Sequence, residues 1–418
     1  MNVAKTKPSE EFSNPFKPGA GHMPPYLAGR ETETEEFRRL LTQKTILRNL
    51  VLTGLRGVGK TVLLETLKPI AIDMEWLWSG ADLSESASLT EERLALRLIT
   101  DLSFITSNIV IGSQAVSDRD YARSDVGFQG EKRRAPYTLN YQTLLEIYNH
   151  TPGLTYDKLK AVLEVAWEGL KTQVGLHGVI FSYDEAQNLA DHAEDKEYPL
   201  SLLLDVFQSI QRSEIPFMLV LTGLPTLFPK LVEARTYSER MFRVVTLTHL
   251  NRSDSRDAIK KPIEKENCPV TFNKESVEKI CDISGGYPYF IQFICREVYD
   301  AWIQQTARGV KRSVPVVEIV QKLDSDFFAG RWAKATDRQR ELLTVVARLE
   351  NCASEFTVQE ISTLSKGILA KPFSPSHVSQ MLNSLGEAGL IYKNRYGKYS
   401  FAVPLLWEYI KRQIQQDS

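Results

Sequence analysis

The residues best suited to chemistry lie in one segment, NLVLTGLRGVGKTVLLET, between 49 and 66. An apolar run ends at Gly54, two further glycines precede Lys60 and Thr61, and an apolar helical pattern follows at once. This is the G-x-x-x-x-G-K-[ST] spacing of a phosphate-binding loop, set between a strand and a helix as that loop requires. The predicted contacts to phosphate are Gly54, Leu55, Arg56, Gly57, Val58, Gly59, Lys60, Thr61 and Val62.

Each residue type in this loop has a physical role. Glycines without a Cβ let the backbone N–H groups turn inward around an anion, and the N-terminus of the following helix adds partial positive charge. Lys60 can reach the β and γ phosphates, and the Thr61 hydroxyl can complete the coordination shell of Mg²⁺. A glycine-rich turn with a chance lysine is the alternative, but both flanks favour a site for a nucleoside triphosphate.

A pair of acids follows a second apolar strand, Val179 to Phe181. Ligands of open α/β sheets bind at the carboxyl ends of strands, so Asp184 is expected beside the Mg²⁺ shell. Glu185 would then polarise the attacking water. The alternative is an ordinary acidic start of a helix.

Two further candidates come from the strands that follow. Thr222 ends the apolar strand 216–221, where its hydroxyl could hold the water or sense the γ phosphate, or could cap the next turn. Arg240 precedes the strand 243–247 and could reach the nucleotide of a neighbouring subunit. Arg243 is the rival candidate for that role, and an ordinary surface arginine is the alternative to both.

Tyr26 and Leu27 stand just ahead of the loop domain. They could sandwich a purine ring, or they could pack a helix entry against the sheet. Spacing alone does not separate these two interpretations.

Composition limits the class of protein. The chain has 418 residues, 43% hydrophobic and 25% charged, which is typical of a globular protein of about two to three domains. A net charge of −1 argues against a protein that coats nucleic acid along its whole surface. No apolar run is long enough to cross a membrane, and the four cysteines form no C-x-x-C pair, so we expect a cytoplasmic protein without structural zinc.

The order of patterns predicts an α/β fold, a doubly wound parallel sheet followed by a helical lid and a winged helix-turn-helix. We expect a flexible arm over 1–24, an ATPase core over 25–250, a lid over 251–332 and a winged helix over 333–418. Within the core, the pattern weakens over about 103–156. We expect a long connection there, and its basic residues are more typical of a solvated loop than of a phosphate contact: Arg119, Arg123, Lys132, Arg133 and Arg134.

The last region shows helical patterns over 337–349, 357–364 and 376–388, and an alternating hairpin pattern over 390–403. The third helix of a winged helix commonly enters the DNA major groove. Its outward residues would be His377, Gln380, Asn383 and Ser384, and the wing offers Lys393, Arg395 and Lys398 to phosphates. Binding of a protein by the same domain is the alternative to double-stranded DNA.

Together these motifs resemble those of AAA+ ATPases of the origin-recognition type, from Tyr26 to the C-terminus. GLRGVGKT is similar to the Walker A motif, YDE to Walker B and LTGLP to sensor 1. By this resemblance the turn at 27–31 lies beside adenine, which raises the preference for a purine and implies ATP with Mg²⁺ as cofactors. Thr222 stands where that branch commonly has Asn. The Gly286-Tyr287-Pro288 turn lacks the sensor 2 arginine and resembles the G-x-P turn of STAND signalling ATPases, which places Pro288 at the nucleotide.

The leading hypothesis is a slow, Mg²⁺-dependent ATPase whose nucleotide state sets binding to DNA or to a partner, with a nucleotide-dependent homo-oligomer as one form of assembly. The alternative is a STAND-type signalling or defence switch whose winged helix binds a protein effector. A regulator that binds ATP and barely hydrolyses it is the third.

Overall fold

The computed structural model describes residues 13–19, 21–107, 110–115, 134–266, 268, 271–307 and 315–416. The chain so described divides into two compact units. The first, called here the sheet unit, comprises residues 32–53 and 64–246. The second, called the lid–wing unit, comprises the described residues up to Glu31 together with 54–63 and 247–418.

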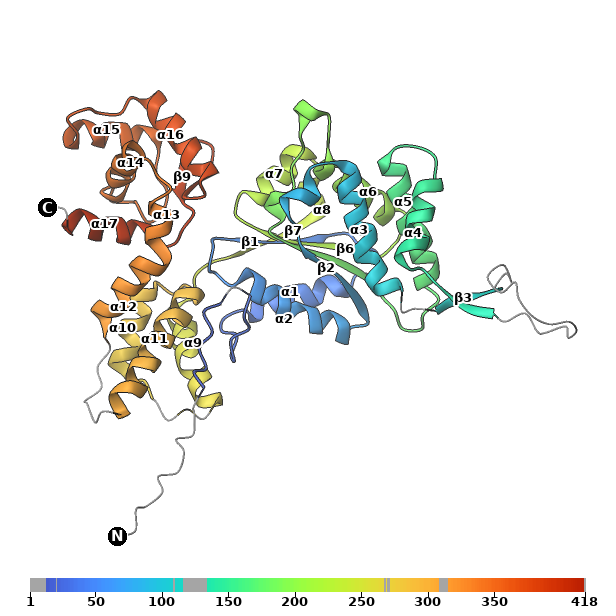
Figure 1. Ribbon diagram of the computed structural model, residues 1–418, viewed down its shortest axis with the longest axis horizontal. Helices are drawn as coiled ribbons and strands as arrows, with labels where there is room; N and C mark the ends of the chain where they lie inside the picture. Colours follow the sequence, from blue (N-terminus) through green and yellow to red (C-terminus); the bar gives the residue numbers. More distant parts are fainter. Residues whose placement is uncertain are drawn as a thin grey trace, which may run out of the picture. The chain divides into compact units, whose positions relative to one another are not determined.

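In the described residues, the main sheet has five strands in the order β2-β5-β6-β1-β7 (Figure 1). β2, β5, β6 and β1 pair in parallel. Strands β1, β5 and β6 are buried along their whole length, as their continuous apolar runs predict. The strand bounds are β1 Asn49–Gly54, β2 Trp76–Asp82, β5 Gly178–Asp184, β6 Phe217–Gly223 and β7 Phe242–Leu247.

Helices cover both faces of this sheet. α1 and α2 lie on one face, and α3, α6 and α7 lie on the other (Figure 1). The bounds are α1 Glu31–Leu41, α2 Lys60–Asp73, α3 Glu91–Thr106, α4 Tyr141–His150, α5 Thr155–Leu170, α6 Pro199–Arg212, α7 Leu227–Ala234 and α8 Ser238–Met241. Short 3₁₀ turns span Glu85–Ser88, Ala186–Asn188 and Ala193–Asp195. The predicted doubly wound parallel sheet is confirmed.

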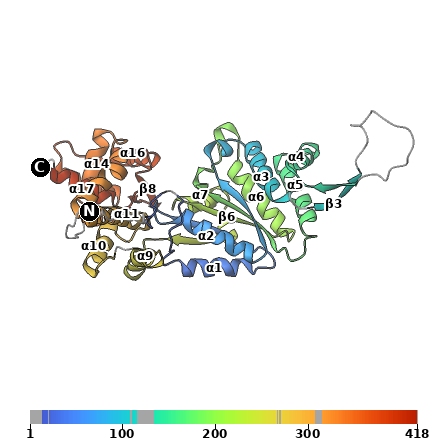
Figure 2. The same ribbon diagram turned by 60° about the horizontal axis from the view of Figure 1, so that its bottom comes forward.

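The region expected to be one long connection contains regular structure. β3 Val110–Ala115 and β4 Arg134–Thr138 form an antiparallel pair, and α4 packs beside α3 and α5 (Figure 2). The expectation was wrong for α4, whose signal is short: Asn140 caps Thr143, and Leu144 and Tyr148 are buried one turn apart. Arg119, Arg123, Lys132 and Arg133 lie outside the described residues, and only the backbone of Arg134 is described.

The lid–wing unit is helical, with a small hairpin near its end. Its lid helices are α9 Arg252–Lys265, α10 Lys274–Ser284 and α11 Pro288–Ala307. α12 Val316–Leu323, a π-helical stretch Asp324–Ala329 and α13 Gly330–Trp332 lead to the winged helix. The winged helix comprises α14 Asp337–Ala347, α15 Val358–Ile368, α16 Pro375–Glu387, β8 Ile391–Arg395, β9 Lys398–Phe401 and α17 Leu406–Gln416.

Side-chain caps define where these helices begin. Asn251 and Asn273 accept the backbone N–H groups of Asp254 and Ser276, and Ser374 caps α16 in the same way. Thr336 and Thr357 each form a reciprocal capping box. The wing hairpin pairs antiparallel, as its alternation predicts, whereas α17 is a helix that the sequence interpretation missed.

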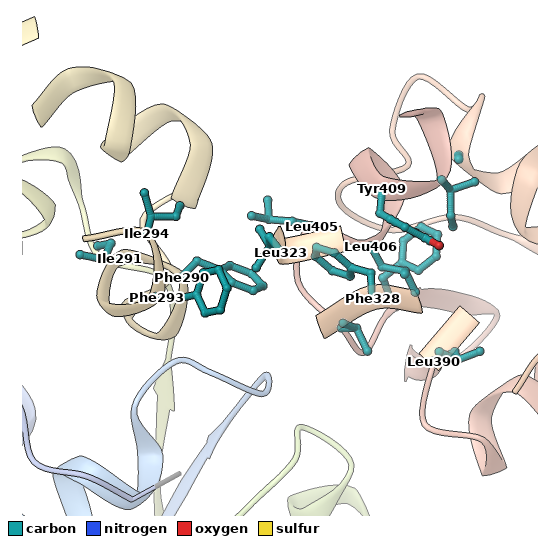
Figure 3. Close-up of a cluster of buried hydrophobic side chains, with 14 of the residues drawn as sticks. Phe290, Ile291, Phe293, Ile294, Leu323, Phe328, Leu390, Leu405, Leu406 and Tyr409 are labelled. Carbon is teal, nitrogen blue, oxygen red and sulfur yellow. The ribbon is translucent and has the colours of Figure 1, made fainter. Parts of the chain in front are cut away.

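One apolar cluster runs through the lid–wing unit (Figure 3). The ring centroids of Phe290 in α11 and Phe328 in the π-helical stretch lie 5.9 Å apart, and Phe328 stacks on Tyr409 of α17 at 5.4 Å. The core of the lid is therefore continuous with the core of the winged helix.

The segment before the core is attached to the lid. Phe16 is fully buried in the same cluster, and Asn14 donates from Nδ2 to the Asp300 carboxylate at 2.8 Å. The Arg296 guanidinium donates to the Phe16 carbonyl at 3.0 Å. Residues around Phe16 are therefore anchored, which the polar composition of the expected flexible arm does not indicate.

Among the helices of the described ranges, none combines the length and the apolar character needed to span a membrane.

Candidate nucleotide site

The loop between β1 and α2 has the backbone shape that its glycines permit. Gly57 and Gly59 have φ of +80° and +90°, a left-handed region that L side chains rarely adopt. A Cβ at Gly57 would lie 3.0 Å from the Tyr289 Cβ, whereas a Cβ at Gly59 would point into open space. The space beside Gly59 is therefore open, as a phosphate-binding loop requires.

Lys60 is folded over this loop. Its side chain is buried, and Nζ donates to the carbonyls of Gly54 at 2.9 Å and Leu55 at 3.0 Å. A buried ammonium needs oxygen partners, and the loop itself supplies them.

Two segments distant in sequence fix the loop from outside. Arg30 is 6% exposed, and its Nη2 donates to the carbonyls of Val58 and Thr248, each at 2.9 Å. The backbone N–H of Tyr289, in the first turn of α11, donates to the Gly57 carbonyl at 3.1 Å. The loop is therefore tied to the turn at 29–31 and to the lid.

The two residues expected to hold a purine are half-buried, as is Pro288 at the start of α11. Lys261 of α9 stands over the Tyr26 ring, with Nζ 4.4 Å from the centroid, and donates to the Tyr26 hydroxyl at 2.9 Å. Pro288 immediately precedes Tyr289, the residue bonded to the loop. The role of Tyr26, Leu27 and Pro288 at a base remains a prediction.

In the sheet unit, Asp184 and Thr222 end neighbouring strands. Tyr183 pairs with Leu221 in the register, so the next residues, Asp184 and Thr222, come side by side on one face at the carboxyl edge. The Thr222 hydroxyl is fully buried and makes no hydrogen bond within the described residues. The turn-capping alternative for Thr222 is therefore wrong, and a buried hydroxyl without a partner calls for a polar ligand.

The end of β5 is held by a buried network. Tyr183 donates its hydroxyl to Asp101 of α3 at 2.9 Å, and Arg97 pairs with the same carboxylate at 2.7 Å. Burial raises the pKa of Asp101, against the opposing effect of Arg97, and it raises the pKa of Tyr183 well above its ordinary value. The strand end that bears Asp184 is thereby fixed.

Glu185 is exposed and adopts a left-handed conformation, with φ of +50°. Its backbone N–H donates to Asp184 Oδ1 at 2.8 Å, and its carboxylate accepts from Gln187 Nε2. Only a 3₁₀ turn follows, so the acidic pair does not begin an α-helix.

The two arginine candidates differ. Arg243 forms an ion pair with Glu36 of α1 at 2.6 Å, which raises the arginine's pKa. Arg240, at the end of α8, is exposed. Because Arg243 is paired with Glu36 of α1, Arg240 stays the candidate for a role in a neighbouring subunit.

In the winged helix, the predicted contacts on α16 are exposed: His377, Gln380, Asn383 and Ser384. Lys393 and Arg395 are exposed on β8, and Lys398 is half-buried on β9. Arg395 is paired bidentately with Glu355 at 2.7 and 3.0 Å, so part of the positive charge of the wing is neutralised.

Sequence reasoning missed Arg30 and Tyr289 beside the loop, and Gln187 in the 3₁₀ turn after β5. The turn containing Arg30 was noticed, but a buried arginine that bonds backbone carbonyls has no spacing signal. Gln187 lies two residues after Glu185, and this is the sequence cue to its position.

Solved structures share this fold. The Walker-type ATPase PABY2304 of Pyrococcus abyssi aligns over 92% of this chain and 96% of its own, with a TM-score of 0.55 and 14% identity. The ORC2 protein of Aeropyrum pernix in its ADP form aligns over 96% of this chain and 97% of its own, with a TM-score of 0.53 and 15% identity. The structure of the same protein in ADPNP-ADP complexes aligns over 96% of this chain and 98% of its own, with a TM-score of 0.53 and 14% identity.

This chain therefore shares the fold of PABY2304 and of the ORC2 protein. The predicted resemblance is thus confirmed at the level of the fold. A family model described as a domain of unknown function (DUF8462) matches residues 325–410, which include α14 to α16, both strands of the wing and the first part of α17. A comparison with curated proteins found no match.

Proposed function

We propose that this protein is a Mg²⁺-dependent ATPase whose bound nucleotide controls the lid and the winged helix. The observation that carries the proposal is the loop: Gly57 and Gly59 have left-handed backbones, the space at Gly59 is open, and Lys60 is buried with its ammonium bonded to loop carbonyls. The ATPase fold supports the same conclusion.

The roles follow from the side chains. The loop amides and Lys60 would bind the phosphates, and Thr61 and Asp184 would supply oxygen ligands to the ion. Bound Mg²⁺ would neutralise charge on the transferred phosphoryl group. Glu185 orients the attacking water, and the orphaned hydroxyl of Thr222 supplies a hydrogen bond at the same edge of the sheet.

Contacts within the lid–wing unit support a path from the nucleotide to the winged helix. Gly57 is bonded to Tyr289, whose ring lies 5.1 Å from that of Phe327 in the π-helical stretch. Phe327 packs on Phe328, which stacks on Tyr409 of the winged helix. These contacts support the proposal that a shift of Gly57 between nucleotide states reaches α17, because a ligand that binds two states unequally shifts their populations.

We further propose double-stranded DNA as the partner of the winged helix, with a protein effector as the competing candidate. The exposed face of α16 and the exposed side chain of Lys393 favour DNA. Phosphate contacts impose a steep salt dependence, so a salt titration of duplex binding tests this step. Equal binding of a duplex and an acidic polymer would favour the effector.

The ATPase proposal is tested by turnover. Wild type should release phosphate from ATP in the presence of Mg²⁺, and Glu185→Gln should reduce release to a small residual rate while leaving ATP binding intact. Glu194→Gln, which changes an exposed acid on a neighbouring 3₁₀ turn, is the matched control and should keep wild-type turnover. Turnover unaffected by Glu185→Gln would refute the role of Glu185, and binding without turnover in wild type would indicate a regulator that does not hydrolyse ATP.

A further inference from the structure

Gln187 joins two parts of the candidate active site that the chain separates. Its Nε2 donates to the Glu185 carboxylate, while its Oε1 accepts the backbone N–H of Leu224 at 3.1 Å. Leu224 lies two residues after Thr222, in the turn that leaves β6. One amide therefore connects the carboxylate proposed to orient water with the strand end that bears the orphaned hydroxyl.

The backbone of Gln187 is held separately. Its carbonyl accepts from Lys230 Nζ of α7 at 2.8 Å, and burial lowers the pKa of that lysine. The next residue, Asn188, donates from Nδ2 to the Leu83 carbonyl at 2.9 Å. Because these bonds fix the 3₁₀ turn, the Gln187 side chain is not needed to keep the turn in place.

The Gln187 side chain lies close to the backbone of β6. A Cβ at Gly223 would lie 2.6 Å from Gln187 Oε1, so a larger residue at this position would displace the amide. Glu185 itself is in the left-handed region, where a non-glycine residue is strained unless its surroundings hold it. The amide of Gln187 is one of the contacts that hold it.

We propose that Gln187 is a positioning residue that aims the Glu185 carboxylate and couples its orientation to the end of β6. This inference rests on the proposed ATPase function. If the end of β6 at Thr222 and Gly223 moves when nucleotide binds, the hydrogen bond from Leu224 would move Gln187 and thereby reorient Glu185. The two halves of the amide have different roles. The N–H₂ group orients the Glu185 carboxylate, and the carbonyl oxygen accepts the backbone N–H of Leu224.

Two substitutions separate these jobs. Gln187→Glu retains an acceptor for Leu224 but places a carboxylate against Glu185, so kcat should fall about tenfold or more while KM for ATP and the melting temperature stay near wild type. Gln187→Met removes both bonds and should lower kcat and the melting temperature together. Asn188→Ala is the matched control on the same turn: it should lower the melting temperature and keep kcat within about twofold.

A double-mutant cycle supplies the direct readout of coupling. Because Gln187 acts through Glu185, Gln187→Glu should add no further loss to residual turnover on a Glu185→Gln background. Wild-type kcat in Gln187→Glu, or losses that add fully in the double variant, would overturn the proposal. Wild-type turnover that does not depend on Glu185 would instead overturn the proposed role of Glu185, and the role of Gln187 with it.

Discussion

Arg30 provides the most quantitative test of how the phosphate loop is held. The substitution Arg30→Met keeps an unbranched side chain of similar reach in the buried site and removes the donors to Val58 and Thr248. A hydrogen bond to a charged group contributes about 1.5–3 kcal/mol. Arg30 is buried and both acceptors are backbone carbonyls. Losing the two hydrogen bonds should therefore lower the free energy of unfolding by about 3 kcal/mol.

For a unit of this size, 1 kcal/mol shifts the melting temperature by about 2–4 °C. The Arg30→Met variant should therefore melt about 6–12 °C below wild type in differential scanning calorimetry. It should also bind ATP more weakly, because the released loop must be ordered at the moment of binding.

Arg39→Met is the matched control for Arg30→Met. Arg39 lies on α1 with 78% of its side chain exposed, and its ion pair with Glu35 spans 3.5 Å. Exposed pairs contribute about 0–1 kcal/mol, so this variant should melt close to wild type. Equal melting temperatures for Arg30→Met and Arg39→Met would refute the claim that Arg30 fixes the loop.

Two further outcomes follow from the structure. Hydrogen bonds from Arg256 and Arg252 lower the pKa of Glu278 to about 2, so its stabilising contribution is present above about pH 4.5 and lost as pH falls toward 2. Across that range, the difference in melting temperature between wild type and Glu278→Gln should become smaller as the pH falls. A difference that stays constant would contradict this. Gly80→Ala would place a Cβ 1.9 Å from the Ser182 carbonyl oxygen at a φ of +132°, so this variant should lose most of its soluble yield, and a wild-type melting curve would show that β2 and β5 can separate.

Local patterns predicted the parts of the fold that depend on neighbours in sequence. The loop at 54–61, the apolar strands and the α16 face each have a periodicity or spacing that specifies them. α4 was missed because its region, about 103–156, shows only a weak pattern overall. Length does not explain why α17 was missed, because α14 and α15 are equally long and were predicted.

The parts of the site that escaped prediction depend on contacts between distant segments. Arg30 meets Thr248, and Phe16 enters a core formed by α10 and α11. Gln187 reaches Leu224 across the sheet edge. Such pairs follow from the tertiary fold, and a single sequence contains no period that reports them.

The measurement closest to the central claim is calorimetric titration of ATP with Mg²⁺ into wild type, Lys60→Ala and Lys68→Ala. Lys68 is an exposed lysine of the same helix and should be dispensable. Loss of a charge-assisted bond from a buried ammonium to phosphate should weaken binding about 100-fold in Lys60→Ala, whereas Lys68→Ala should bind as wild type does. Wild-type affinity in Lys60→Ala would contradict the account.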